Sequence, residues 1–149
     1  MVKDISICME TKFNFKSQIC TSKSQSETLL KLGLKKETAD MCYKVTTHDF
    51  KGNEINEIDR HYTLCCWYDE SSLVCGLERK ETIPAWSLHR LIEMADTTTH
   101  IEEEQWVCMD KCYCWNNYES FYATNLYDSL INCIEWLIKK GYFDKEYLV

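Results

Sequence analysis

Glycine and proline are scarce in this sequence, which has four glycines and one proline in 149 residues. Flexible linkers and glycine-rich phosphate loops depend on such residues, so the chain has little material for either. No apolar run approaches the ~20 residues that span a bilayer. Asp4 and Glu10 lie within the first ten residues, which lack the basic-then-apolar order of a signal peptide. We therefore expect one cytoplasmic domain over residues 1–149 with no membrane partner, in which residues 1–20 form an edge strand or a loose arm.

Long basic runs are also missing. The formal net charge is −7, and no basic run is longer than Lys35-Lys36 or Lys139-Lys140. Proteins that bind duplex nucleic acid normally gather Lys and Arg on one face, so duplex nucleic acid is not an expected partner. An acidic surface can imitate nucleic acid or steer a basic protein, but mild acidity needs no such function.

The first helical pattern follows the polar N-terminal region. Ser24 and Glu27 have the spacing of a capping box, which predicts a short helix that ends at Gly33. Residues 37–43 are predicted as a second turn or short helix.

Two further helices have stronger signals. Ser87 is the expected cap of one, because Trp86 before it and Leu91 after it have the spacing of a hydrophobic staple. Asn125 is the expected cap of the other, which runs to about residue 140 and is stopped by Gly141. One narrow polar stripe marks this last helix as buried on most sides. The stripe consists of Asp128, Asn132, Glu135 and Lys139.

Strand patterns predict two β-hairpins. Residues 62–68 and 73–77 flank a turn-like segment, and residues 106–115 and 118–123 flank Asn116-Asn117, which suits a two-residue primed turn. The strands do not alternate with helices as a parallel sheet would require. The expected fold class is therefore α+β, an antiparallel sheet built from two hairpins with three or four helices packed on it.

Three segments resemble small uncharacterised proteins that are encoded by phages and mobile elements of gut bacteria. These segments are residues 26–43, 83–94 and 122–148, about two fifths of the chain. The matching groups are Thr38-Ala39-Asp40-Met41, Pro84-x-Trp86-Ser87-Leu88 and Glu135-Trp136-Leu137. The resemblance implies a shared fold and an accessory gene of such an element. It implies no catalytic residues.

Ten cysteines suggest a metal site. Two groups of cysteines are expected to lie together: alternate residues of one predicted strand, whose thiols face the same side, and residues on the two strands of a predicted hairpin. The first group is Cys108, Cys112 and Cys114, and the second is Cys65, Cys66 and Cys75. Structural zinc sites usually present paired Cys-x2–4-Cys knuckles, and no Cys-x-x-Cys occurs here. We expect reduced thiols that pack as small hydrophobes and no cofactor, with a zinc-stabilised structural module as an alternative.

Catalytic motifs are missing as well. The four histidines stand in no motif with a cysteine, and serine-hydrolase and metalloprotease signatures are absent. His89 and Glu93 lie one helical turn apart, and with His100 they form a weak candidate cation site. A small hydrolase-like enzyme that uses His89, Glu93 or Asp110 stays open as an alternative, although a non-enzyme is favoured.

Aromatic residues make up 13% of the chain. Exposed aromatics at hairpin tips can stack on a base or anchor a protein, and arginines nearby can contact phosphates. The candidate ligand-binding residues are Trp67, Tyr68, Arg79, Arg90, Tyr113, Trp115 and Tyr118. The same aromatics can instead close the core or a homodimer interface.

The expected function combines these observations. The sequence favours a non-enzymatic binding protein, an accessory factor of a phage or mobile element. By analogy, such factors act on host machinery, including defence systems, by occupying a host protein or by sequestering a small nucleotide-like ligand.

Overall fold

In the part of the chain that the structure describes, two antiparallel sheets and three α-helices make up the fold, which confirms the α+β class. The structure is a computed structural model that describes residues 17–72, 74–96, 108–110, 113–115 and 118–149. The predicted N-terminal arm therefore lies largely outside the described residues. The helices are α1 (Lys23–Lys31), α2 (Leu88–Asp96) and α3 (Leu126–Lys140), with 3-10 turns η1 (Lys36–Thr38), η2 (Glu57–Asp59) and η3 (Lys145–Tyr147). The strands are β1 (Met41–His48), β2 (Tyr62–Cys65), β3 (Val74–Cys75), β4 (Glu78–Ala85), β5 (Cys108–Asp110), β6 (Tyr113–Trp115) and β7 (Ser120–Tyr122).

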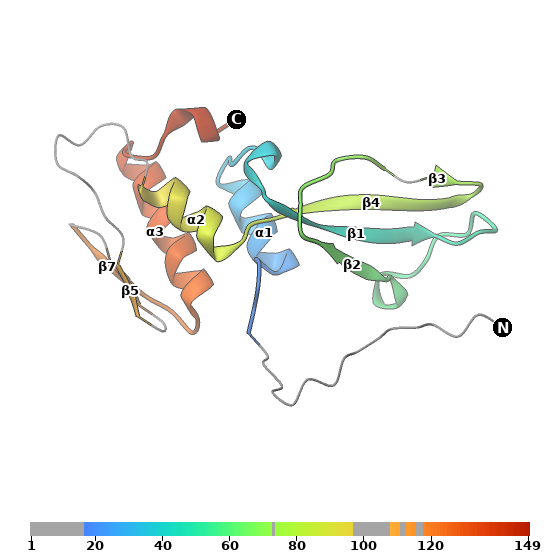
Figure 1. The fold of residues 1–149 in the computed structure, drawn as a ribbon, viewed down its shortest axis with the longest axis horizontal. Helices are drawn as coiled ribbons and strands as arrows, with labels where there is room; N and C mark the ends of the chain where they lie inside the picture. Colours follow the sequence, from blue (N-terminus) through green and yellow to red (C-terminus); the bar gives the residue numbers. More distant parts are fainter. Residues whose placement is uncertain (1–16, 73, 97–107, 111–112, 116–117) are drawn as a thin grey trace.

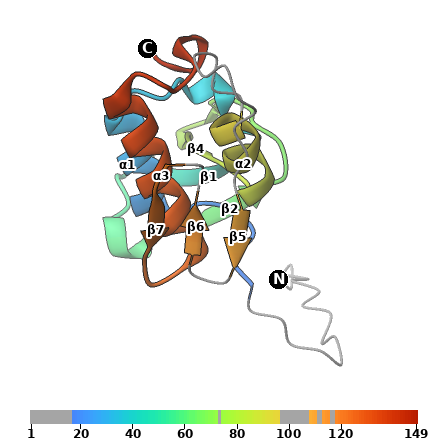
Figure 2. The ribbon, with the colours of Figure 1, turned by 90° about the vertical axis from the view of Figure 1, so that its left-hand side faces the viewer.

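The helices form one body, and the four-stranded sheet projects from it as an arm (Figure 1). We call β1 to β4 and their connecting turns the sheet arm. The second sheet, β5-β6-β7, lies on the other side of the helices, where β6 and β7 contact α3 (Figure 2). The main core lies among the helices and includes Trp86, Leu91, Leu130 and Ile134, all fully buried.

Helix α3 follows its sequence pattern closely. The Asn125 side chain accepts from the Asp128 backbone N–H at 2.9 Å, and Gly141 ends the helix with a φ of 73°. Of the predicted polar stripe, Asn132 and Lys139 are exposed, whereas the opposite residues are buried. The prediction of this helix is confirmed.

Helix α2 also begins where the sequence predicts. The Ser87 hydroxyl accepts from the Arg90 N–H at 3.2 Å, which confirms Ser87 as its cap. Asp40 in turn accepts hydrogen bonds from the Ser87 N–H and from the Ser87 hydroxyl. The segment before β1 is therefore fixed to the start of α2.

Helix α1 is capped by Ser22 rather than Ser24, which corrects the prediction. Ser22 Oγ accepts from the Gln25 N–H at 3.2 Å, and Gln25 Oε1 accepts from the Ser22 N–H at 2.9 Å. Ser22 with Gln25 and Ser24 with Glu27 both have the spacing of a capping box, so the local sequence does not distinguish between them. In the observed helix Ser26 is buried, and its hydroxyl lies 2.8 Å from that of Thr21.

Strand β1 corrects the predicted turn or helix at residues 37–43. Only η1 is helical there, and the chain is extended from Met41 onward. Met41, Cys42, Val45 and Thr47 of β1 are buried, and both edges of the strand are paired, with β2 and with β4. Pairing on both edges outweighs the weak helical pattern.

The first predicted hairpin is wrong in its pairing. Strand β2 pairs with β1 and strand β3 pairs with β4, so the order β2-β1-β4-β3 places β2 and β3 on opposite edges. The hairpin that does form joins β3 to β4 through Gly76 and Leu77, and Gly76 has a φ of 62°. The long strand β4 was not expected from the sequence.

The second predicted hairpin is present with a different connection. Strand β6 pairs with β7, but Trp115 lies opposite Ser120, so residues 116–119 connect them and the two-residue turn is wrong. Asn116 and Asn117 lie outside the described residues. The segment 106–115 also divides into β5 and β6, which pair with each other.

Candidate binding surface

The face of the sheet arm that carries Lys44 bears a pocket of about 250 Å³. Because directly opposed residues share a face, the register places Lys44 of β1 beside Thr63 of β2 and Thr82 of β4. The segment between β2 and β3 crosses this face. We call this site the lysine pocket; its lining residues are Lys44, Thr63, Asp69, Ser71 and Lys80.

Lys44 holds the crossing segment to the sheet. Its ammonium donates to the carbonyl oxygens of Asp69 at 2.8 Å and Ser71 at 2.6 Å, and to Thr82 Oγ1 at 2.9 Å. Asp69 Oδ2 lies 3.3 Å from the same ammonium. The Ser71 backbone N–H, its hydroxyl and Lys44 together hold the pKa of the Asp69 carboxyl below its usual value. The Lys44 ammonium therefore has a structural role: it holds the crossing segment against the sheet.

Lys80 is the free cation of the lysine pocket. Its side chain is half-buried, and it makes no hydrogen bond or ion pair with any residue that the structure describes. Lys80 lies opposite Thr46 and therefore on the same face as Lys44. A lysine in this position can accept an anionic group.

Trp67 and Tyr68 begin the crossing segment and have different surroundings. Trp67 is 66% exposed, whereas Tyr68 packs against the main core, where burial raises the pKa of its hydroxyl. The Cys42 thiol donates to the Trp67 carbonyl oxygen at 3.3 Å. Trp67 is therefore presented to solvent on a backbone that is tied to β1.

The distal end of the sheet arm carries exposed apolar side chains. We call Phe50, Val74 and Leu77 the apolar tip; they are 72%, 63% and 55% exposed. Leu77 packs closely on the neighbouring turn, since a Cβ at Gly52 would lie 3.2 Å from its Cδ1. The apolar tip therefore belongs to two adjoining turns (Figure 1).

The turn that presents Phe50 is internally hydrogen-bonded. Asp49 Oδ1 accepts from the backbone N–H groups of Lys51 at 2.8 Å and Asn53 at 2.9 Å. The Gly52 N–H also donates to the Asp49 carbonyl at 3.0 Å. The Asn53 N–H, more than any other group, holds the pKa of the Asp49 carboxyl below its usual value. Phe50 is thus held out on an ordered turn.

The seven candidate ligand-binding residues do not form one site. Trp67 and Tyr68 follow β2, Arg79 lies near the distal end of β4, and Arg90 lies on α2, where it pairs with Glu93 at 3.1 Å. Tyr113 and Trp115 belong to β6 of the other sheet. Tyr118 also lies beside that sheet.

Tyr118 takes part in a cluster of aromatic rings over α3. Its ring stacks on Trp136 with 6.2 Å between centroids and lies 6.1 Å from Tyr142. Phe121 meets the same Trp136 ring edge-on at 6.1 Å. In this cluster Tyr118 packs on the outer side of α3 and is still 51% exposed.

The sequence did not single out Lys44, Lys80, Phe50 or Leu77. The alternation of Met41, Tyr43 and Val45 is the signal that would have identified β1 and, with it, the face of Lys44. The tip depends on pairing between distant strands, for which no local signal exists.

The strand pairing separates the thiol groups that the sequence suggested. Cys108 and Cys114 lie on the paired strands β5 and β6 rather than on one strand, and Cys112 lies outside the described residues. Cys75 lies on β3, at the opposite edge from Cys65 on β2. Among the described residues, no three His, Cys, Asp or Glu side chains are placed to hold a metal ion.

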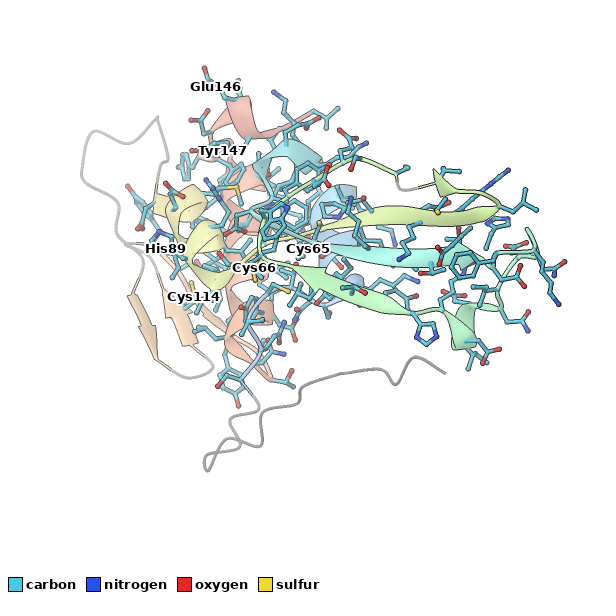
Figure 3. All side chains as sticks on the ribbon, turned by 45° about the vertical axis from the view of Figure 1, so that its right-hand side comes forward. Cys65, Cys66, His89, Cys114, Glu146 and Tyr147 are labelled. Carbon is cyan, nitrogen blue, oxygen red and sulfur yellow. The ribbon has the colours of Figure 1, made fainter. Side chains whose placement is uncertain are left out.

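The candidate catalytic residues belong to different elements, and no interaction between them and a cysteine joins them into one site among the described residues. His89 is exposed on α2, and it lies with Cys114 on the helical side, whereas Cys65 and Cys66 lie at the end of β2 that faces the helices (Figure 3). Glu93 pairs with Arg90, and Asp110 is in β5. His100 lies outside the described residues.

No family model, no curated protein and no solved structure matches this chain. Within the described part of the chain, no helix has the length and apolar character that crossing a bilayer requires.

Proposed function

We propose that this chain is a non-enzymatic binding protein whose sheet arm docks onto a partner protein. The observation that carries the proposal is the apolar tip, three large side chains that are each more than half exposed at the end of the arm. Exposed apolar groups that gather in this way are typical of interaction sites.

The composition of the tip supports a protein rather than a small ligand. Protein interfaces combine an apolar centre with a polar rim. At the tip, Phe50 and Leu77 are flanked by Asp49, Lys51 and Arg79, which carry both signs of charge. The ordered turn around Asp49 lowers the entropy that Phe50 would lose on binding.

The family resemblance supports a bacterial host protein as the partner. Segments 26–43, 83–94 and 122–148 resemble proteins encoded by phages and mobile elements. Such accessory factors often act on host machinery, and a component of a host defence system is the partner class that follows by analogy.

Crosslinking and affinity capture from a gut-bacterial lysate test the proposal. The test variant is Phe50→Ser with Leu77→Ser, and the matched control is Tyr122→Ser, which is as exposed but lies on β7 of the other sheet. We expect one partner that wild type and the control capture equally and that the tip variant loses by at least about tenfold. Equal capture by all three proteins, or no specific partner, contradicts the proposal.

A nucleotide-like ligand in the lysine pocket is the second candidate. The ammonium of Lys80, which has no partner among the described residues, favours it, because a phosphate is the natural partner of such a cation. Trp67 is exposed on the segment that also contributes Asp69 and Ser71, so its ring is available to stack on a base.

Isothermal calorimetry with a panel of mono-, di- and cyclic nucleotides tests this second candidate. We expect Lys80→Met to weaken binding by about tenfold or more, and Lys140→Met, an exposed lysine at the end of α3, to leave it unchanged. Absence of heat with every nucleotide excludes the sequestering function.

A further inference from the structure

Cys42 and Cys65 are directly opposed on the antiparallel strands β1 and β2. Opposed residues of such a pair have Cα atoms about 4.5–5.5 Å apart, within the roughly 4.4–6.8 Å range of disulfides. Both side chains also point to the same face of the sheet. The register therefore places the two thiol side chains beside each other on one face of the sheet.

The two thiols differ in access. Cys42 is fully buried, whereas Cys65 is half-buried on an edge strand that has no neighbour beyond it among the described residues. Burial raises the pKa of the Cys65 thiol, and the neighbouring Cys42 raises it further. A disulfide reagent can thus reach Cys65 directly but can reach Cys42 only through Cys65.

From this geometry we propose that Cys42 and Cys65 are a dithiol site that a small disulfide, such as oxidised glutathione, converts to an intramolecular disulfide. The Cys65 thiolate attacks the reagent, forms a mixed disulfide and releases one glutathione thiolate. The Cys42 thiolate then attacks Cys65 Sγ and releases the second. The protein loses two protons and two electrons, and one oxidised glutathione becomes two reduced glutathione molecules.

The other neighbouring cysteines are less suited to this reaction. Cys114 and Cys133 are hydrogen-bonded to each other, which lowers the pKa of Cys114, but both are fully buried, so no reagent reaches them. Cys75 is exposed on β3 but has no opposed thiol, since its partner is Glu78. Cys75 should accept glutathione and keep it.

Closure of the disulfide has a local consequence. The Cys42 thiol now donates its proton to the Trp67 carbonyl oxygen. A disulfide has no such proton, so the backbone of the crossing segment loses one of its links to β1. The site therefore couples thiol oxidation to the segment that presents Trp67, and this holds whichever ligand the protein binds.

Peptide mapping after treatment of the folded protein with oxidised glutathione tests the proposal. We expect the wild-type protein to yield a crosslinked peptide pair that joins Cys42 to Cys65, and to yield it faster at pH 9 than at pH 7, because the thiolate is the attacking form. In Cys42→Ser the mixed disulfide has no resolving thiol, so glutathione should remain on Cys65.

Two further variants keep the test decisive. Cys65→Ser, at a half-buried position that tolerates the change, should leave Cys42 as an unmodified thiol. Cys75→Ser is the matched control and should crosslink as wild type does, with one fewer glutathione adduct. Free thiols at both positions after treatment, a stable glutathione adduct on wild-type Cys65, or a crosslink of Cys65 or Cys66 to any other cysteine would overturn the proposal.

Discussion

Trp86 lies where the sheet arm joins the helical body, and its side chain is fully buried. Its indole Nε1 donates to Thr38 Oγ1 at 3.0 Å, and its backbone N–H donates to Thr21 Oγ1 at the same distance. Both polar groups are thus satisfied inside the core, so the large apolar ring is buried without an unpaired donor. One residue links the N-terminal segment, η1 and the start of α2.

We predict that Trp86→Ala lowers the free energy of unfolding by about 3–5 kcal/mol, because it leaves a cavity and removes the indole that donates to the Thr38 hydroxyl. Trp67→Ala, at an exposed site, should change it by no more than about 0.5 kcal/mol. Urea denaturation followed by circular dichroism measures both values. Equal destabilisation by the two variants would contradict the burial of Trp86.

Asp69 should contribute to acid sensitivity. Its pKa is lowered in the folded protein, so the folded state binds fewer protons than the unfolded chain. The carboxylate therefore stabilises the fold above its unfolded pKa of about 4, and this stabilisation is lost as pH falls through the lower, folded pKa.

Asp69→Asn should accordingly be less stable than wild type at neutral pH and should lose less stability on acidification from about pH 6 to about pH 3. Urea midpoints across a pH series measure the slope. Asp59→Asn, whose carboxyl makes no hydrogen bond with a described residue, is the control and should keep the wild-type slope. The same slope in all three proteins would refute a role for Asp69.

At the scale of elements, helix α3 was predictable because all its signals are local. The Asn125 cap, the polar stripe and Gly141 lie within 17 consecutive positions of the sequence, from 125 to 141. The pairing of β2 with β1 and of β3 with β4 was not predictable, because two short runs separated by a turn-like segment read as a hairpin. Strand β4 begins with four consecutive charged residues, Glu78 to Glu81, so it also lacks an alternating apolar signal.

Gly141 offers a test of the helix end. A Cβ at this position would meet no atom within 4 Å, so Gly141→Ala isolates the strain of its left-handed backbone. We expect a loss of about 1–2 kcal/mol in the free energy of unfolding. Lys140→Ala, one residue earlier in ordinary helical backbone, should have almost no effect. A Gly141→Ala protein as stable as wild type would mean that the helix ends differently.

At the scale of the whole molecule, the burial of apolar groups is uneven. The main core lies among the helices, whereas the small second cluster lies at the inner end of the sheet arm and contains Cys20, Met41 and Ala85. None of the described residues at the distal end of the sheet arm belongs to either cluster.

The candidate site was only partly predictable from the sequence. Trp67 was identified by its residue type, but Lys80 and Leu77 become neighbours of other site residues only through long-range strand pairing.

Native-state hydrogen exchange should reveal this gradient. We expect amides of β3 and of the first half of β4 to exchange through local opening, at a lower free energy than the amides of α3, whose opening requires loss of the main core. Mass spectrometry of peptic fragments measures the difference. Protection of the distal arm equal to that of α3 would show that the molecule opens only as one unit.

The strand order has a consequence for a nicked chain. Because the crossing segment joins opposite edges of the sheet, a protease cut near Ser71 would leave β2 bonded to β1 in one fragment, while β4 of the other fragment still pairs with β1 along its length. The two pieces should migrate together in gel filtration and separate only in denaturant. Severing this covalent link therefore yields a two-chain complementation system, in which the two fragments can be made separately and recombined.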